Sequence, residues 1–179
     1  LISPRLLEST SPLDLHAPDG FFSVPVALAM WVVAVVVIAI SVRRVGDTFD
    51  ERAIPLMGVS AAFIFAAQMI NFPVVGGTSG HLLGAVLAAI LLGPWAGTLV
   101  MASVIAVQSL VFQDGGLLAM GANIVNMGLI GTIGGYAIYR TVARILGGEE
   151  RRRLPAAAIA AWSAVMLGAA ATSFELALS

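Results

Sequence analysis

The stretch LLGAVLAAILLGPWAGTLVMASVIAVQSLVF, residues 82–112, decides how many helices this chain forms. It runs for 31 residues without a charged side chain, and as one helix it would be about 46 Å long at about 1.5 Å per residue. The hydrocarbon core of a bilayer is only about 30 Å thick. A proline inside a helical pattern ends or kinks the helix just before it. The Gly93-Pro94 pair therefore predicts two helices, a short one at about residues 79–92 and a second at about 95–112.

The composition of the whole chain places it in a membrane. Of the 179 residues, 59% are hydrophobic and only 11% are charged, whereas soluble domains carry about 25% charged residues. The mean hydropathy of +0.99 leaves too few polar side chains to cover a surface facing water. This excludes soluble globular, disordered and nucleic-acid-binding proteins. The absence of cysteine excludes disulfides and thiolate metal sites.

Four further predominantly apolar runs each have about the length needed to cross a bilayer. They lie at about residues 21–42, 54–72 and 118–140, and from Pro155 to the end of the chain. Pro25 falls in the first turn of the first run, where a missing N–H costs nothing, so that run begins as a helix there. The sequence thus predicts an all-α, polytopic membrane protein with six transmembrane helices in a single domain.

The arginines predict how these helices are oriented. Arginine-rich short loops lie on the cytoplasmic side of membranes. With the N-terminus outside, eight of the nine arginines fall inside: Arg43, Arg44, Arg52, Arg140, Arg144, Arg151, Arg152 and Arg153. The opposite orientation would leave only Arg5 inside. We therefore expect a multi-pass protein of the cell (inner) membrane with its N-terminus outside.

This orientation gathers the polar side chains at the outer mouth of the bundle. The candidate site residues found there are His16, Asp19, Gln68, Asn71, His81, Asp114, Asn123 and Asn126. Neutral imidazole suits nickel, cobalt, copper and zinc, so His16 and His81 are the candidate metal ligands. Two isolated histidines are more often polar loop residues at an interface. The Gly-rich GGTSGHLLG loop and the HAPDG turn favour the metal site, because glycine permits close approach of the backbone.

The amides have two interpretations. Gln68 and Asn71 are three residues apart, as are Asn123 and Asn126, so each pair shares a helix face. They either join neighbouring helices by hydrogen bonds or orient the imidazoles, and their spacing does not distinguish these roles. Glu175 lies within the last helix, where an ionisable residue is expensive and indicates function, unless that helix ends at the outer interface.

Motifs for catalysis are lacking. The sequence contains neither the GxxxxGK[ST] phosphate loop nor HExxH, so we expect no enzyme and no bound nucleotide. Glycines spaced four apart, such as Gly93 and Gly97 or Gly131 and Gly135, are typical of close helix packing. Capture of a metal ion competes with two other hypotheses, a vitamin-type substrate-binding component and a membrane assembly protein without a ligand.

Several segments resemble the cobalt/nickel substrate-binding component of energy-coupling factor ABC transporters, the CbiM/NikM family. They are HAPDGFFSVPVALA, PLMGVSAAFIFAAQMINFPVVGGTSGHLLGAVLAAILLGPWAGTLVM, FQDGGLLAMGANIVNMG and FELALS, and the resemblance covers about residues 15–179. It implies capture of Co2+ or Ni2+ outside the cell, for nickel enzymes or cobalamin synthesis. The implied partners are a coupling transmembrane subunit, two ATPase subunits and a small auxiliary membrane subunit.

The resemblance also implies a nitrogen-only metal site. In this family the mature chain begins Met-His, and the ligands are the terminal amine, the backbone nitrogen and ring of that histidine, and the histidine of TSGHLLG. The matching histidines here are His16 and His81. Four nitrogens suit Ni2+ and related ions, but they do not distinguish nickel from cobalt.

The sequence departs from the family pattern at both ends. Leu15 stands where the family has Met, and residues 1–14 form an N-terminal extension before the transmembrane domain at 15–179. We expect the functional chain to be cleaved before Leu15, or to start there at a leucine codon read as the initiator methionine. The family has seven helices, so we expect a further helix after Ser179.

Overall fold

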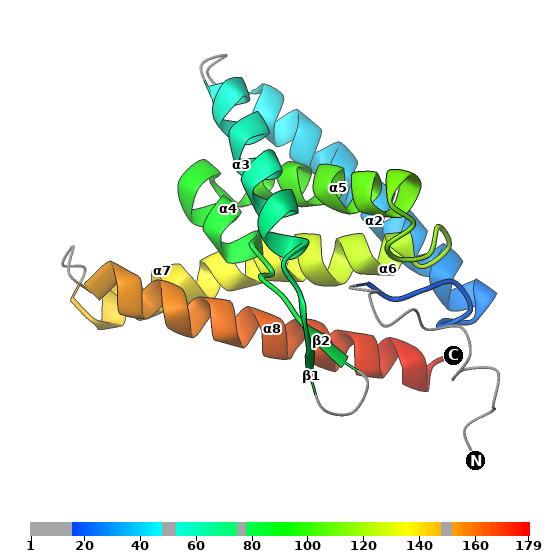
Figure 1. Ribbon diagram of the computed structural model, residues 1–179. Helices are drawn as coiled ribbons and strands as arrows, with labels where there is room; N and C mark the ends of the chain where they lie inside the picture. Colours follow the sequence, from blue (N-terminus) through cyan, green and yellow to red (C-terminus); the bar gives the residue numbers. More distant parts are fainter. Residues whose placement is uncertain (1–15, 48–52, 75–77, 148–151) are drawn as a thin grey trace.

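The computed structural model describes residues 16–47, 53–74, 78–147 and 152–179 (Figure 1). The helices are α2 (Val24–Gly46), α3 (Ala53–Gln68), α4 (Ala85–Leu92), α5 (Pro94–Val111), α6 (Met120–Asn123), the π-helix η1 (Ile124–Gly134), α7 (Gly135–Ile145) and α8 (Arg153–Ala177). A hairpin of β1 (Phe72–Val74) and β2 (Thr78–Gly80) joins α3 to α4. Because α6, η1 and α7 follow one another without a break, the described residues form six helical segments. This confirms the helical fold and the number of helices.

The break in the long apolar run lies where the sequence predicts it. Gly93 ends α4 and precedes α5, with a φ of +85°, which a residue carrying a Cβ rarely adopts. Pro94 is the first residue of α5, a position where its missing N–H and fixed φ suit the helix. Together these two residues turn the chain between two helices.

The short helix predicted at about residues 79–92 is wrong in its first half. Residues 78–80 pair with β1, Phe72 opposite Gly80 and Val74 opposite Thr78, and α4 covers only Ala85–Leu92. Gly84 has a φ of +79°, a left-handed conformation that cannot continue a helix. The helix predicted to reach residue 72 likewise stops at Gln68. Pro73 explains part of this, because a residue preceding proline is disfavoured in the α conformation.

The helix predicted at about residues 118–140 starts close to its expected position and runs on to Ile145. Its middle section, Ile124–Gly134, is a π-helix. A π-helix is rare and occurs frequently at functional sites. The apolar periodicity of the sequence does not distinguish it from an α-helix.

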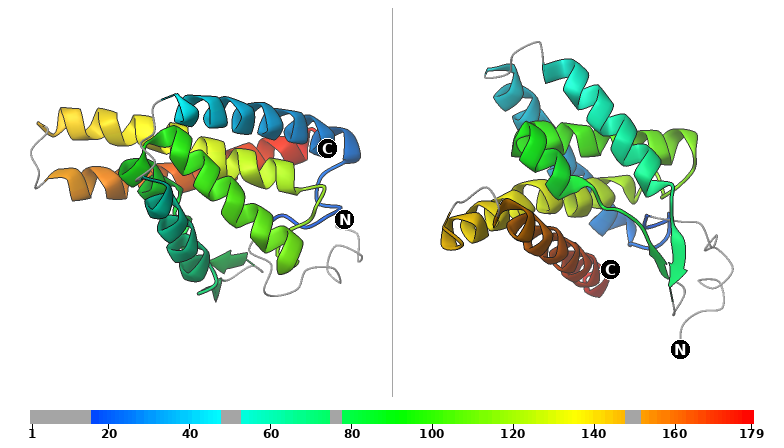
Figure 2. Two further views of the ribbon diagram at one scale, coloured as in Figure 1. Left: turned by 90° about the horizontal axis from the view of Figure 1, so that it is seen from above. Right: turned by 60° about the vertical axis from the view of Figure 1, so that its left-hand side comes forward.

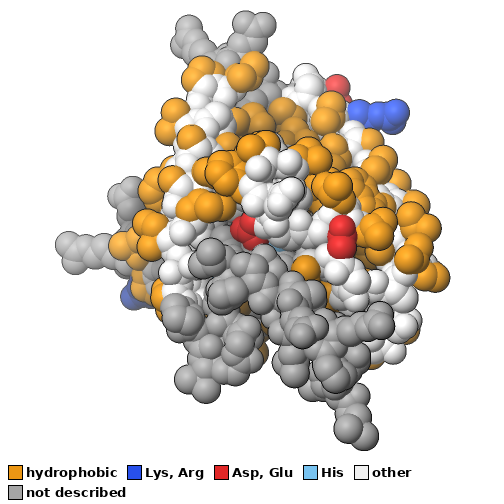
Figure 3. All heavy atoms as spheres, turned by 45° about the vertical axis from the view of Figure 1, so that its right-hand side comes forward, with side chains coloured by type: hydrophobic (Ala, Val, Ile, Leu, Met, Phe, Trp, Pro, Cys, Tyr) orange, Lys and Arg blue, Asp and Glu red, His pale blue; other side chains and the backbone are white. Residues whose placement is uncertain are grey.

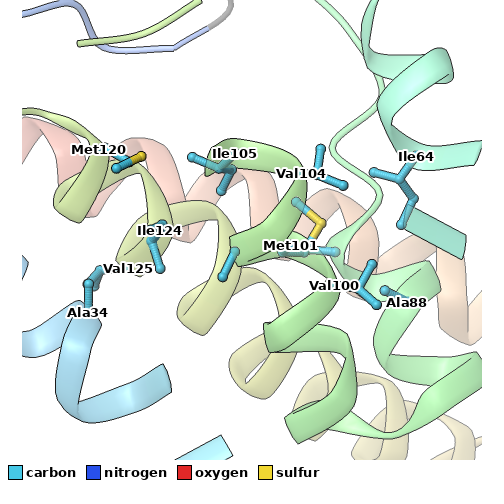
Figure 4. Packing of buried hydrophobic residues seen from close by; sticks show 12 residues of the cluster. Ala34, Ile64, Ala88, Val100, Met101, Val104, Ile105, Met120, Ile124 and Val125 are labelled. Carbon is cyan, nitrogen blue, oxygen red and sulfur yellow. The ribbon is translucent and has the colours of Figure 1, made fainter. Parts of the chain in front are cut away.

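The core of the bundle lies around α5. More than half of the α5 span is buried (56%), compared with 22% for α2 and 17% for α8. Figure 4 shows α5 side chains between those of α3, α4 and the α6–η1 segment. The fully buried core residues include Ile64, Met101 and Ile105. The polar hydroxyls of Thr98 and Thr132 meet in the same interior at 2.6 Å.

Glycine permits the closest helix contacts, as the four-residue spacing predicts. A Cβ at Gly97 would lie 2.9 Å from the backbone N of Ala89, and one at Gly131 would lie 2.7 Å from the Cβ of Ala85. Real Cβ atoms do not approach other atoms this closely. These glycines bring α5 and η1 against α4.

We therefore expect Gly97→Ala to destabilise the bundle. The neighbouring atoms belong to the α4 backbone and cannot rotate away, so the helices must separate at a cost of about 1–3 kcal/mol. Thermal unfolding in detergent should show a lowered midpoint. Gly58→Ala in α3, where a Cβ meets nothing within 4 Å, is the control and should leave the midpoint unchanged or raise it. Equal midpoints for Gly97→Ala and the wild type would contradict this packing.

The described helices have the surface of a multi-pass membrane protein. Three of them, α2, α5 and α8, are long and apolar enough to cross a bilayer. Large hydrophobic side chains on their outer surfaces are exposed, among them Val32 at 66% and Trp162 at 67%. Figure 3 shows hydrophobic side chains over much of one face.

The connections between helices lie at two opposite ends of the bundle. At one end the ring of His16 approaches that of His81, and the N–H of Ser23 donates to the hydroxyl of Ser179 at 3.2 Å. We call this the histidine end. At the other, the arginine end, the Arg44 guanidinium lies over the Trp95 ring at 5.7 Å. In Figure 1 the start of α2 and the C-terminus lie far from the end of α7 and the start of α8, and these two helices form an antiparallel pair (Figures 1 and 2).

Candidate metal centre

Asp19 anchors the segment that carries His16. Its carboxylate accepts hydrogen bonds from the backbone N–H groups of Leu117, Leu118 and Ala119 at 3.1, 2.7 and 3.2 Å. These amides precede α6 and have no helical partner of their own, so a carboxylate is favourable there. The sequence suggests Asp19 as a pocket residue. The structure places it under the site as an anchor for residues 16–20.

Two glycines let this segment pack against the loop at residues 113–116. Gly115 has a φ of +91°, and a Cβ on it would lie 2.7 Å from the Cβ of His16. A Cβ on Gly116 would overlap both the carboxylate and the backbone N of Asp19. The backbone N–H of Gly116 also donates to the carbonyl of Ala17 at 3.0 Å. The QDGG sequence is therefore required for close approach to His16.

Asn123 fixes the backbone directly after His16. Its Oδ1 accepts from the N–H of Ala17 at 3.2 Å, and its Nδ2 donates to the carbonyl of the same residue at 3.3 Å. Asn123 thus satisfies both the N–H and the carbonyl of Ala17, as a neighbouring β-strand would. The sequence leaves open whether this amide joins helices or orients an imidazole, and the contacts observed are with the backbone of Ala17.

His16 is buried without hydrogen bonds. The residue is 5% exposed, and within the described ranges neither ring nitrogen has a hydrogen-bond partner. Nδ1 lies 3.3 Å from Oδ1 of Asp114, a contact of opposite charges only if the ring is protonated. A buried polar group without a hydrogen bond costs about 1–3 kcal/mol. Such a ring is suited to receive a ligand.

His81 faces His16 across the site. The ring centroids are 6.1 Å apart and the rings are inclined at 50°. Imidazole nitrogens bind first-row metal ions at about 2.0–2.1 Å, so the centres of two rings on one ion are at most about 6 Å apart. The observed separation is at this limit.

The local contacts of His81 select one ring nitrogen for a ligand. Nδ1 lies 3.0 Å from the carbonyl oxygen of Leu82, and that oxygen can only accept. The contact is a hydrogen bond in the tautomer that carries the proton on Nδ1, which puts the lone pair on Nε2. A backbone carbonyl at the second nitrogen is a common way of orienting a metal-binding histidine.

Two buried glutamines support the segment after His81. Gln68 Nε2 donates to the carbonyl of Leu83 at 2.8 Å, and Gln108 Nε2 donates to Gln68 Oε1 at 2.9 Å. The backbone N–H of Asp114 donates to the carbonyl of Gln108 at 3.0 Å. The pair therefore links the His81 segment to the Asp114 loop. Gln68 is a site candidate in the sequence, whereas Gln108 is not among the candidates, because its only signal is an amide within an apolar helix.

Two predicted amides lie apart from the histidines. Asn126 donates to Thr172 Oγ1 at 3.1 Å and to Glu175 Oε2 at 2.9 Å, which joins η1 to α8. Asn71 is half-buried between α3 and β1, and no hydrogen bond connects it to either histidine in the described part of the chain. The structure therefore groups His16, His81, Asp114 and Asn123, with Asp19 and Gln68 supporting them.

The side chains alone do not complete a coordination sphere. Within the described ranges, no group of three or more His, Asp or Glu side chains is placed to hold a metal ion. Leu15 and the N-terminal extension, residues 1–14, lie outside the described residues.

A family model described as "Cobalt uptake substrate-specific transmembrane region", CbiM, matches residues 16–179. The chain belongs to the CbiM family. The match begins at His16 and covers every described element. This confirms the resemblance of the sequence to the CbiM/NikM family.

Relatives within the family carry the names of nickel or cobalt transport proteins. The chain is 41% identical over 165 residues to one named for fused nickel transport (NikMN) in Archaeoglobus fulgidus, covering 92% of this chain and 53% of the relative. It is 35% identical to the fused nickel transport protein NikMN of Rhodobacter capsulatus, covering 90% and 46%. A relative named for cobalt transport (CbiM 1) in Methanosarcina barkeri is 32% identical, covering 92% and 71%. The chain thus spans about half the length of the fused relatives.

Solved structures show the same fold. A crystal structure described as a truncated transition metal transporter superposes with a TM-score of 0.83 at 35% identity, covering 90% of this chain and 73% of that one. A second transition metal transporter gives a TM-score of 0.82 at 35% identity, covering 90% and 69%. CbiM-family membership and the multi-pass helical fold therefore rest on sequence and structure together.

Asn123 and Asn126 provide a matched pair for testing how the site is supported. We expect Asn123→Ala to weaken metal binding by about 10–100-fold, the usual cost of losing a group that orients a ligand. Asn126→Ala should leave the affinity unchanged, because that side chain contacts α8. Calorimetric titration with Ni2+ measures both. Equal losses in the two variants would show that general destabilisation, and not positioning of His16, is responsible.

Proposed function

We propose that this protein captures Co2+ or Ni2+ outside the cell, for ATP-driven import by an energy-coupling factor transporter. The observation that supports this most strongly is His16. Its ring is buried, both nitrogens are without hydrogen-bond partners among the described residues, and His81 lies 6.1 Å away between ring centroids. A divalent ion between the rings would satisfy the polar atoms that the fold leaves buried.

The proposed orientation puts the histidine end outside and the arginine end in the cytoplasm. The positive-inside rule supports it, since Arg44, Arg140 and Arg144 lie at the arginine end. In a protein with six membrane crossings, α4 and the segment before it must cross the bilayer together. At eight residues, α4 is only about 12 Å long, and the non-helical residues 81–84 extend it toward the histidine end.

We propose four nitrogen ligands for the ion. His16 and His81 supply the rings, and the backbone nitrogen of His16 and a free amine directly before it supply the others, as the family resemblance implies. Asp114, 3.3 Å from His16 Nδ1, helps to orient that ring. Intact mass of the membrane-extracted protein tests this arrangement, because a functional chain that retains residues 1–14 has no free amine next to His16.

Transport requires energy that this chain does not supply. The sequence contains no phosphate loop, so two ATPase subunits, a coupling transmembrane subunit and a small auxiliary subunit would drive reorientation and inward release. The names of the relatives include both nickel and cobalt transport. Both ions accept nitrogen ligands, so the proposal includes both.

Calorimetric titration of the purified, chelator-treated protein with Ni2+, Co2+, Zn2+ and Mg2+ tests the function. We expect one site per chain for Ni2+ or Co2+ and no binding of Mg2+, which prefers oxygen ligands. The affinity should fall in acid, because metal binding requires deprotonated ligands. A chain with no affinity for any transition metal would support a membrane assembly protein, and one that binds a vitamin instead would support a vitamin-type component.

A further inference from the structure

A cavity lies at the arginine end of the bundle, away from the histidines. It has a volume of about 490 Å³ and lies between α4, α7 and α8. Its lining includes Arg140 and Arg144 of α7, Arg153 of α8, Tyr136 and Tyr139 of α7, and Ile90 of α4. The metal-binding proposal gives this cavity no role.

The lining is arranged for an anion. Arg140 and Arg144 are four residues apart on α7, so they share a helix face with Tyr136, and the Arg140 guanidinium lies over the Tyr136 ring at 5.9 Å. Arg153 begins α8, whose N-terminal amides have no side-chain cap, and such amides attract negative charge. Among the described residues, no carboxylate lines this cavity. The segment from residue 140 to 153 carries five arginines and two glutamates, a net charge of +3.

Exposed apolar side chains lie next in sequence to three residues that line the cavity. Leu91 follows Ile90 and is 55% exposed, Ile145 follows Arg144 and is 77% exposed, and Leu154 follows Arg153 and is 80% exposed. Each of them is next in sequence to a residue that lines the cavity, one on each of the three helices. Hydrocarbon next to guanidinium groups matches a ligand that is anionic at one end and apolar at the other.

We propose that this cavity binds the phosphate headgroup of an anionic phospholipid, with the acyl chains against Leu91, Ile145 and Leu154. Guanidinium groups pair with phosphate oxygens through two parallel N–H donors, and basic pockets between membrane helices bind anionic headgroups. The volume is that of a small-molecule site. A free phosphate would leave most of it empty, and an acidic peptide would need a groove longer than this cavity.

Native mass spectrometry of the delipidated protein with added phosphatidylglycerol or phosphatidylcholine tests the proposal. We expect wild type to retain phosphatidylglycerol in preference to phosphatidylcholine. In Arg140→Gln/Arg144→Gln the ratio of the two bound lipids should fall by more than about tenfold. The control is Arg43→Gln/Arg44→Gln, which removes the same charge at the same end but outside the cavity, and it should retain the preference. Thermal unfolding in detergent checks that both double variants are folded.

Four results would overturn the proposal. An undiminished preference in Arg140→Gln/Arg144→Gln would exclude the cavity, and equal losses in both double variants would indicate diffuse surface charge. Binding of inorganic phosphate or glycerol 3-phosphate with the same arginine dependence, and no lipid retention, would assign the site to a free phosphate. Binding of a glutamate-rich peptide in place of lipid would assign it to an acidic protein segment. None of these results affects metal binding at the histidine end, so the two proposals fail independently.

Discussion

His81→Ala is expected to weaken the binding of Ni2+ and Co2+ by more than about 100-fold, beyond the effect of losing a group that only orients a ligand. The variant removes one of the two rings that face each other at 6.1 Å and leaves His16 as the single imidazole. Calorimetric titration measures the change. His16→Ala should give a loss of the same order, because one ion requires both rings.

Asn71→Ala is the matched control for His81→Ala. Asn71 lies between α3 and β1, close to His81 in sequence, and has no described hydrogen bond to either histidine. Its replacement should leave the affinity within about twofold of wild type, because surface substitutions away from specific contacts have small effects. Undiminished binding in His81→Ala, or an equal loss in Asn71→Ala, would remove His81 from the site.

Gly116→Ala is expected to have the second large effect, through the position of His16. A Cβ at this residue would overlap the backbone and carboxylate of Asp19, and backbone atoms cannot rotate away. The segment at residues 16–20 would have to leave the loop, breaking the three hydrogen bonds that Asp19 accepts. We expect metal affinity to fall at least as far as in Asn123→Ala, by about 100-fold.

Gly46→Ala, at the end of α2, is the control for this glycine. A Cβ there meets nothing within 4 Å, so affinity and melting temperature should remain those of wild type. The helices of the Gly116→Ala variant should stay folded, which circular dichroism can verify, because its clash is confined to the two loops. Wild-type affinity in folded Gly116→Ala would contradict the docking of the His16 segment.

Much of the fold could be predicted from the sequence because membrane helices follow simple rules. Long uncharged runs and the Gly93-Pro94 break identify six helices, and the structure confirms them. The hairpin at residues 72–80 could not be predicted in this way. It lies within an apolar stretch, and the conformation that ends the helical pattern depends on the positive φ of Gly84, which hydropathy does not report.

The candidate site was predicted less completely. The two histidines were chosen by residue type and orientation, and the structure brings them together. Asp19 and Asn123 are named by the sequence, but their roles depend on contacts with residues about 100 positions away. Asn126 has the same spacing signal as Asn123 and instead binds Glu175 and Thr172 of α8. Sequence spacing shows which residues share a helix face, and it cannot show which helix that face meets.

The central claim is that one metal ion is shared by His16 and His81, and X-ray absorption at the nickel edge tests it most directly. Wild-type protein loaded with one equivalent of Ni2+ should show a shell of four nitrogen ligands, with the multiple-scattering signature of two imidazoles. His81→Ala, loaded at a concentration that fills the site, should show one imidazole. Six oxygen ligands without imidazole scattering, or an identical spectrum in the variant, would contradict the shared site.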